Sequence, residues 1–351
     1  MSARLMMRDA NGEADFYNSG STDQNTIRAN SASMDKLLLR SRVLVDVAGC
    51  DTSTTLWDQK IAFPLGIAPA GIAGLAHKDG ELASARASQA KGTPMGVSSF
   101  ANYHINDIRA NGPNVPLAMQ VYTMKNRELM ERIIRRAESH GCKAIFLTAD
   151  SPVLGVRYNE WKNDFRSPLG YPNFEMSVED FNQSTHDASF RKFNDDGHSW
   201  EKDIPWIRAR TKMQIFIKGV LCAEDVEKAI EAGCDGVIVS NHGGRQLDGV
   251  PATIDALPDC VAAAKGKIQI HVDGGFRRGA DIFRALALGA QSVWVGRPAL
   301  WGLAVSDHPT VFWVASVLTC NSTTDRPVWR RCLIFCRKSS CAACRCVAAV
   351  L

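Results

Sequence analysis

The sequence predicts an α/β protein built as a (β/α)8 TIM barrel, because strand-length apolar segments alternate with helical patterns along most of the chain. The eight apolar segments are residues 63–70, 94–99, 116–122, 144–150, 214–219, 236–241, 268–275 and 292–298. Such alternation predicts a parallel sheet. Polar residues at the carboxyl ends of all eight segments favour a closed barrel over the alternative, an open doubly wound sheet.

The helical patterns between these segments have recognisable ends. Residues 79–92 begin with Asp79 in the N-cap position and stop at Gly92. Residues 125–141, 222–234 and 277–290 end at or next to a glycine, which tolerates the left-handed conformation that follows a helix. We therefore expect these segments to be helices that cover the sheet.

Three parts of the chain are expected outside this regular pattern. Residues 1–60 are mixed and turn-rich, with one short predicted strand from Val43 to Val47, and should pack on the barrel. The barrel itself spans residues 61–304 and contains a long loop, 151–213, which is expected to be a lid or, in its middle, a disordered insertion. Residues 305–351 have weak helical periodicity and are expected to be atypical, leaving the eighth helix compromised and a homo-oligomer in doubt.

The charge is concentrated in this last segment. Of the 41 Lys and Arg and the 37 Asp and Glu in the chain, six and two lie in residues 305–351, so the remaining 35 of each sign balance. A neutral body argues against nucleic acid or an anionic membrane as the main partner. No secretory signal and no apolar run of membrane-spanning length, roughly 18 residues, is present. We expect a cytoplasmic protein, with a peroxisomal or mitochondrial location left open.

The 11 cysteines divide at the same place. Five are scattered through the body, which indicates reduced thiols, and six crowd between Cys320 and Cys346. A zinc site in this tail is an alternative, but the spacing fits no common ligand pattern and no histidine accompanies it. An altered reading frame or an atypical isoform is favoured, and no metal is expected.

The stretch GVIVSNHGGRQLDG, residues 236–249, carries the strongest chemical signal. A buried strand ends there, and His242 can exchange a proton near neutral pH. Arg245 offers a planar fork that matches a carboxylate. Gly243 and Gly244 let the backbone approach a ligand closely. A base and an anion clamp on one loop predict an enzyme acting on a small acid, with a merely solvated turn as the alternative.

The last two loops of the predicted barrel carry a second signal. VDGGFRRG and VGRP supply glycine amides, arginines and a helix start, at Asp273–Arg278 and Gly296–Arg297. Loops in this position of a barrel often bind a phosphate through backbone N–H groups. We therefore expect a phosphorylated cofactor or substrate. Further polar groups at the strand ends are Ser98, Gln120, Tyr122, Thr148, Asp150, Lys218 and Ser240.

These stretches resemble the FMN-dependent α-hydroxy-acid oxidases and dehydrogenases, a family that includes glycolate oxidase, lactate oxidase and mandelate dehydrogenase. SNHGGRQLDG is close to a signature of that family, and PLGIAPAGIAGLAHKDGE is similar to its first strand and loop. The likeness runs from about Asp15 to Leu303. It implies bound FMN, an L-2-hydroxy acid such as lactate or glycolate as substrate, and oxygen or another electron acceptor.

The resemblance also implies roles for individual residues. His242 would be the base, Asp150 would orient and stabilise it, Arg245 and Arg157 would bind the substrate carboxylate, and Tyr122 would hydrogen-bond nearby. Lys218 would lie beside the flavin, where negative charge grows on reduction. The flavin and ribityl chain would be lined by Pro69, Ala70, Gly71, Ser98, Gln120, Thr148 and Ser240. The ribityl and phosphate end would be held by Asp273, Gly274, Gly275, Arg277, Gly296 and Arg297.

Three pocket residues depart from the family pattern. Phe16 stands where a tyrosine hydroxyl usually reaches the substrate carboxylate, and Phe100 stands where tryptophan is frequent. Gly71 replaces an alanine and is expected to leave room beside the flavin. Two alternatives to the hydroxy-acid enzyme remain at this point. One is a catalytically impaired or silent FMN-binding barrel caused by the altered C-terminus, and the other is a different FMN barrel such as type 2 isopentenyl-diphosphate isomerase.

Overall fold

Eight parallel strands close into a barrel in the computed structural model, which describes residues 13–44, 51–181 and 186–305. The strand order around the barrel is β10-β3-β4-β5-β6-β7-β8-β9, and every neighbouring pair is parallel. The strands are β3 (Leu65–Ile67), β4 (Met95–Val97), β5 (Leu117–Tyr122), β6 (Ala144–Thr148), β7 (Gln214–Val220), β8 (Gly236–Val239), β9 (Gln269–Asp273) and β10 (Ser292–Val295). The predicted barrel is confirmed, and the open doubly wound sheet is wrong.

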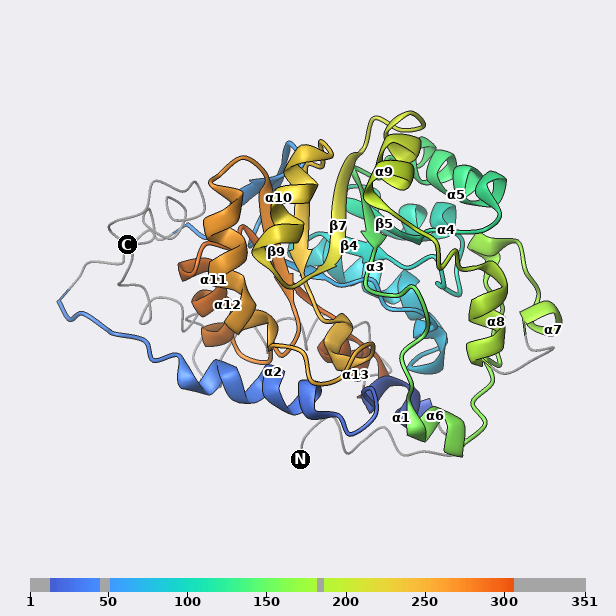
Figure 1. Ribbon diagram of the computed structural model, residues 1–351, viewed down its shortest axis with the longest axis horizontal. Helices are drawn as coiled ribbons and strands as arrows, with labels where there is room; N and C mark the ends of the chain where they lie inside the picture. The colour runs from blue at the N-terminus through green and yellow to red at the C-terminus, as the bar shows by residue number, and fades with distance from the viewer. Residues whose placement is uncertain (1–12, 45–50, 182–185, 306–351) are drawn as a thin grey trace.

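Helices follow the strands and form the outer layer (Figure 1). They are α3 (Gly80–Lys91), α4 (Ile105–Asn111), α5 (Arg127–Ser139), α9 (Trp200–Arg208), α10 (Ala223–Glu231), α11 (Thr253–Ala264), α12 (Gly279–Ala287) and α13 (Arg297–Val305). Gly92 ends α3 with a left-handed φ of 63°, as predicted. Asp79 precedes that helix but makes no capping hydrogen bond, because its carboxylate pairs with Arg86 at 2.6 Å.

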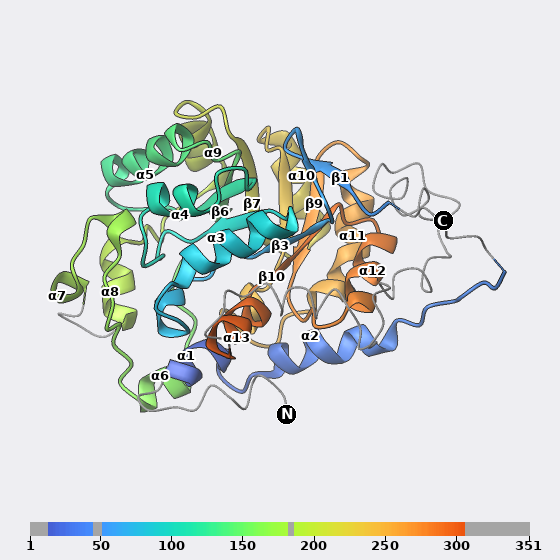
Figure 2. The same ribbon diagram turned by 180° about the vertical axis from the view of Figure 1, so that it is seen from behind.

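A two-stranded hairpin closes the amino-terminal end of the barrel (Figure 2). It consists of β1 (Thr54–Leu56) and β2 (Gln59–Ile61), which are antiparallel. Trp57 and Asp58 at its tip have positive φ angles, 51° and 59°. The Trp57 ring is buried and belongs to the barrel interior, where it stacks on Trp294 at 5.9 Å.

The opposite, carboxyl end of the barrel is covered by segments from several parts of the chain (Figure 1). The N-terminal α1 (Glu13–Asn18) and α2 (Asn25–Lys36) lie there beside η4 (His242–Gly244) and α13. The long loop after β6 adds α6 (Tyr158–Lys162), η3 (Pro172–Phe174), α7 (Val178–Phe181) and α8 (His186–Phe193) before α9. This loop is therefore largely structured where it is described, and several of its side chains reach the barrel mouth.

Some expectations fall outside the described residues. Val43 and Leu44 belong to no strand, and the rest of the short strand predicted up to Val47 lies in residues 45–50, which are not described. The cysteine-rich tail lies in residues 306–351, also outside the described part, together with the alternative zinc site. Among the described residues, every helix falls short of the length and apolar content that a membrane crossing requires.

Candidate active site

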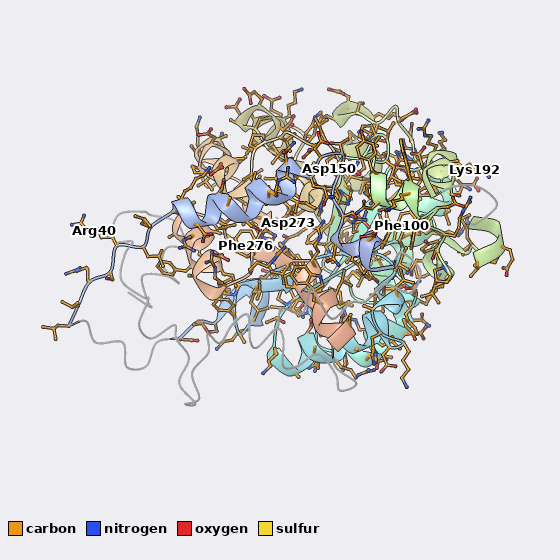
Figure 3. The ribbon with its side chains drawn as sticks, turned by 90° about the horizontal axis from the view of Figure 1, so that it is seen from below. Arg40, Phe100, Asp150, Lys192, Asp273 and Phe276 are labelled. Atoms are coloured by element: carbon orange, nitrogen blue, oxygen red, sulfur yellow. The ribbon has the colours of Figure 1, made fainter. Side chains whose placement is uncertain are left out.

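A pocket lies at the carboxyl ends of the strands. Its volume is about 1210 Å³ when the solvent-filled space at its open mouth is included. Every predicted site residue except Asp150 and Ser240 lines it. These lining residues are Pro69, Ala70, Gly71, Ser98, Gln120, Tyr122, Thr148, Arg157, Lys218, His242, Arg245, Asp273, Gly274, Gly275, Arg277, Gly296 and Arg297. Figure 3 looks onto this end of the barrel, with Asp150, Asp273 and Phe276 toward the middle and Arg40 and Lys192 at the periphery.

His242, which lines this pocket, is hydrogen-bonded to Asp150, which does not line it. The distance from Nδ1 of His242 to Oδ1 of Asp150 is 2.9 Å, although the residues lie 92 positions apart. Asp150 follows β6 and His242 follows β8, so both sit where their strands end. Because an ionised Asp150 carboxylate can only accept, Nδ1 of His242 must carry the hydrogen of this bond, and a neutral imidazole then leaves Nε2 as an acceptor. The pair has the arrangement of a base and the group that orients it.

The charge states of this pair follow from burial and mutual attraction. Burial lowers the pKa of His242 below 6.5, while the Asp150 carboxylate opposes that effect. Burial alone would raise the pKa of Asp150, but His242, Lys218 and the Ser151 hydroxyl together lower it below 3.8. At neutral pH the pair is therefore a neutral imidazole beside an ionised carboxylate, the form in which the imidazole can accept a proton.

Two arginines meet a buried carboxylate at the pocket mouth. Nη1 of Arg157 donates to Oε1 of Glu160 at 2.9 Å, and Nη2 of Arg245 donates to the same oxygen at 3.3 Å. Nη1 of Arg245 donates to the backbone carbonyls of Phe16 and Ser19, which fixes the guanidinium against the N-terminal segment. Burial and the neighbouring Arg157 lower the pKa of Arg245 to about 9, so it stays a cation at neutral pH. Within the described chain, Nε of Arg245 and Nη2 of Arg157 donate to no acceptor, and these N–H groups are available to a ligand.

Tyr122 contributes a neutral hydroxyl to the same region. Burial raises its pKa above the usual 10, an effect to which the Asp150 carboxylate adds. Its ring packs edge-on against Phe190 at 5.3 Å and Phe100 at 5.8 Å. The hydroxyl therefore remains protonated and can donate a hydrogen bond.

Lys218, Ser240 and Asp273 form a chain across β7, β8 and β9. The Ser240 hydroxyl donates to Oδ1 of Asp273 at 2.6 Å and accepts from Nζ of Lys218 at 3.1 Å and from the His242 backbone N–H at 3.1 Å. Nζ of Lys218 lies 3.5 Å from Oδ2 of Asp273. Ser240 was expected to line the flavin; it is not among the residues that line the pocket, and its contact with the flavin stays a prediction. Its hydroxyl joins the lysine, the aspartate and the histidine loop.

The remaining polar wall is internally hydrogen-bonded. Nε2 of Gln120 donates to Oγ1 of Thr148 at 2.9 Å, and Oε1 of Gln120 accepts from the Ser98 hydroxyl at 3.3 Å. Gly71 was expected to leave room here, but a Cβ at this position would lie 2.9 Å from Cβ of Phe100. Phe100 fills that space, so the expectation of free room is wrong.

The glycine-rich end of the pocket is shaped by close backbone approaches. Gly275 has a φ of 86°, and a Cβ there would lie 2.2 Å from the carbonyl oxygen of Asn30 in α2. Gly296 faces open space on its Cβ side, so its backbone borders the cavity directly. The Arg297 guanidinium donates to the backbone carbonyls of Tyr17, Gly243 and Ser19 at 2.7, 2.8 and 3.0 Å. Arg297 thus also ties the N-terminal segment and the histidine loop together.

Several pocket residues were missed from the sequence. Leu154 and Phe190 come from the long loop after β6, and Trp294 comes from the barrel interior. Tyr17 also lines the pocket, and its hydroxyl donates to the backbone carbonyl of Ile72. Glu160 gave one weak signal, its spacing of three residues from Arg157, which places the two side chains on one face of a helix.

The described residues fit an FMN-sized cofactor. A buried cation, Lys218, lies on the strand side of the pocket, and glycine backbone borders the cavity at Gly296. Two further cations, Arg277 and Arg297, line the same end. This combination suits an isoalloxazine that gains negative charge and a phosphate bound at loop glycines. The fold and pocket are those of a flavin-dependent barrel oxidoreductase.

Comparison with known proteins gives the family. The model of the FMN-dependent dehydrogenase family matches residues 8–324. Human 2-hydroxyacid oxidase 1 is 42% identical over 313 residues, which cover 87% of this chain and 84% of the human protein. Glycolate oxidase 3 of Arabidopsis thaliana is 45% identical over 303 residues, covering 85% and 82%. The chain belongs to the FMN-dependent dehydrogenase family and is an FMN-dependent oxidoreductase of the 2-hydroxy-acid oxidase type.

Solved structures agree with this assignment. Mandelate oxidase in complex with (S)-4-hydroxymandelic acid superposes with a TM-score of 0.84 at 32% sequence identity, covering 90% of this chain and 89% of that one. The similarity therefore extends over most of the chain. It shows that this chain and mandelate oxidase share the same overall fold.

Proposed function

We propose that this enzyme oxidises an L-2-hydroxy acid to the 2-oxo acid, with His242 as the base. The observation that carries the proposal is the convergence of the His242–Asp150 pair with two arginines around one pocket. Bound FMN supplies the acceptor for the two electrons that leave the substrate. The residues that would hold it are the wall and loop residues given above, from Pro69 to Arg297, with Lys218 beside the ring.

In this proposal His242 removes a proton from the α-carbon or the hydroxyl of the substrate. Its depressed pKa keeps the imidazole neutral and ready to accept that proton at neutral pH. Asp150, held at 2.9 Å from Nδ1, fixes the ring and stabilises the imidazolium once the proton has moved. The arrangement needs no further protein base.

The substrate carboxylate is assigned to the two arginines. Arg245 presents Nε and Arg157 presents Nη2, neither of which donates to another described residue, so a carboxylate can accept from both. Tyr122 would donate a further hydrogen bond from its protonated hydroxyl. These contacts hold the acid by one end and leave its hydroxyl-bearing carbon near His242.

The side chain of the acid would face an apolar wall. Phe16, Phe100, Leu154 and Phe190 line this part of the pocket. Such a wall favours an aromatic or branched substituent over the hydrogen of glycolate, because burying more apolar surface stabilises the complex. The mandelate oxidase relative was solved with an aromatic hydroxy acid, which is consistent with this preference.

A substrate panel tests the proposal. FMN-loaded enzyme would be given glycolate and the L and D forms of lactate, a branched-chain and an aromatic 2-hydroxy acid, with the 2-oxo acid quantified. We expect product from the L forms, with kcat/KM higher for the larger apolar acids than for glycolate. A yellow, FMN-loaded protein that produces no 2-oxo acid from any member of the panel would instead identify a silent barrel.

A further inference from the structure

Glu160 lies between the two substrate-binding arginines. It sits in the first turn of α6, three residues after Arg157, and only 6% of the residue is exposed. One of its oxygens, Oε1, accepts from Arg157 at 2.9 Å and from Arg245 at 3.3 Å. Arg157 is 4% exposed and the side chain of Arg245 is 15% exposed, so the two cations and the anion form a largely buried cluster.

Such a cluster has a definite charge. Two buried guanidinium groups repel one another, and the carboxylate between them cancels one of the two charges. The group of Arg157, Arg245 and Glu160 therefore carries a net charge of +1. This net charge of +1 is neutralised by one carboxylate of a ligand, so no positive charge is left to stabilise a second carboxylate.

The hydrogen bonds of Glu160 and the side chains of the surrounding pocket wall also favour a ligand with a single carboxylate. Glu160 occupies Nη1 of Arg157 and Nη2 of Arg245, which restricts the ligand to the remaining N–H groups. The nearby wall contributes the apolar side chains of Leu154 and Phe190 and no cation. Among the described lining residues, the other cations are Lys218, paired with Asp273, and Arg277 and Arg297 at the glycine-rich end.

We propose that Glu160 is a specificity-determining residue, which sets the charge of the carboxylate site to +1 and so selects monocarboxylic over dicarboxylic 2-hydroxy acids. This inference rests on the proposed function, because it takes the arginine pair as the site for the substrate carboxylate. Glu160 does not contact the reacting atoms. It acts through the two guanidinium groups.

Binding of two small carboxylate anions that differ by one negative charge tests the proposal without turnover. Dissociation constants of propionate, a monoanion, and malonate, a dianion, would be measured by calorimetry on FMN-loaded wild type and Glu160→Gln at pH 7.5. The glutamine keeps an oxygen that can accept from both arginines while removing the charge. Because the added positive charge acts on two ligand charges rather than one, we expect the malonate-to-propionate affinity ratio to rise by about tenfold.

Two further variants separate charge from geometry. The double variant Arg157→Gln/Glu160→Gln has one cation left, a net charge of +1, and should return the affinity ratio to within about threefold of the wild-type value. It also tests the proposal if the single variant fails to fold. Glu175→Gln is the matched control, because Glu175 likewise accepts from two arginines, Arg132 at 3.2 Å and Arg136 at 2.6 Å, but on the surface away from the pocket.

Two outcomes would overturn the assignment. One is an unchanged affinity ratio in Glu160→Gln with propionate still bound. The other is an equal rise in the Glu175→Gln control. Failure of the proposed function is a separate result, since it would appear as wild-type enzyme that binds carboxylates but forms no 2-oxo acid.

Discussion

At the scale of single residues, the site depends on His242 having a neutral imidazole and a fixed ring. Its backbone is left-handed, with a φ of 56°, which is uncommon for a residue with a side chain and indicates a turn held by its surroundings. The Ser240 hydroxyl accepts from the His242 backbone N–H, and Asp150 holds the ring nitrogen. Both the position and the protonation state of His242 are thus set by neighbouring strand ends.

This arrangement predicts the pH dependence of flavin reduction. Only neutral His242 accepts a proton, so kcat/KM should fall with decreasing pH below a pKa that lies under 6.5. In Asp150→Asn the carboxylate that raises this pKa is lost, so the acid limb should move to lower pH. The maximal rate should fall by about 10²- to 10⁴-fold, because the imidazolium loses its partner.

The measurement is the pH profile of anaerobic flavin reduction in both enzymes. Asp164→Asn, at an exposed carboxylate (71% of its side chain), is the control and should leave the profile unchanged. An acid limb at the same pH in wild type and Asp150→Asn would disprove the pairing.

Much of the candidate site could be predicted from the sequence at this scale. Asp150 and His242 are far apart in the chain, but each follows a buried strand, and the carboxyl ends of barrel strands meet at one face. Glu160 could not be predicted in this way, because it lies in α6 of the long loop and not at a strand end; its spacing of three residues from Arg157 was the one signal. Ser240 was placed at the correct end of β8, but the sequence could not tell that its hydroxyl would turn toward Lys218 and Asp273.

At the scale of elements, the stretch from Gly236 to Gly249 also organises the N-terminal segment. Its Asp248 carboxylate accepts from the backbone N–H groups of Thr26 at 2.7 Å and Asn25 at 3.1 Å, the first residues of α2. Gln24, the residue preceding that helix, makes no capping bond of its own. Helix α2 is therefore capped by a loop more than 200 positions later, which local sequence rules could not predict.

Asp248→Ala should lower the free energy of unfolding by about 1 kcal/mol at pH 7, the usual cost of losing a helix cap. Burial alone would raise the pKa of Asp248, but the Thr26 and Asn25 N–H groups hold it at about 2. Because this pKa is depressed, the stabilisation is present above the unfolded-state pKa of about 3.9 and is lost as pH falls toward 2.

Urea unfolding at pH 7 and at pH 3 measures this effect. The difference between wild type and Asp248→Ala should shrink at the lower pH. Asp259→Ala, at an exposed aspartate in α11, should have no comparable effect. Equal differences at the two pH values would show that the carboxylate is not the cap.

At the scale of the whole molecule, the alternation of strands and helices predicted the barrel. It did not predict which side chains pack inside the barrel. Phe146, Phe216 and Trp294 point inward, and the Trp57 ring enters from the hairpin below. Glycines make the space for them, since a Cβ on Gly66 would lie 2.4 Å from the Trp294 ring. Strand periodicity identifies buried segments, but it cannot tell which large ring meets which glycine across a closed barrel.

Trp57→Ala should therefore destabilise the entire barrel. Removing a buried indole leaves a cavity and typically costs about 3–5 kcal/mol. Because Trp294 both stacks on Trp57 and lines the cofactor pocket, the variant should also bind FMN more weakly. Denaturant unfolding and an FMN titration would measure the two effects.

The same substitution at an exposed tryptophan provides the control. Trp161 is 59% exposed, and Trp161→Ala should change stability by no more than about 0.5 kcal/mol. A similar decrease in the free energy of unfolding in Trp57→Ala and Trp161→Ala would contradict the role assigned to the barrel interior.

The central claim is that the arginine pair would hold a 2-hydroxy acid and His242 would take its proton while bound FMN accepts the two electrons. Anaerobic rapid mixing tests this claim most directly. FMN-loaded wild type, His242→Gln and the surface control His140→Gln would each be mixed with an L-2-hydroxy acid while the flavin absorbance is followed. We predict rapid bleaching in wild type and His140→Gln and a rate lower by at least about 10²-fold in His242→Gln. Bleaching at the same rate in all three proteins, or in none of them, would contradict it.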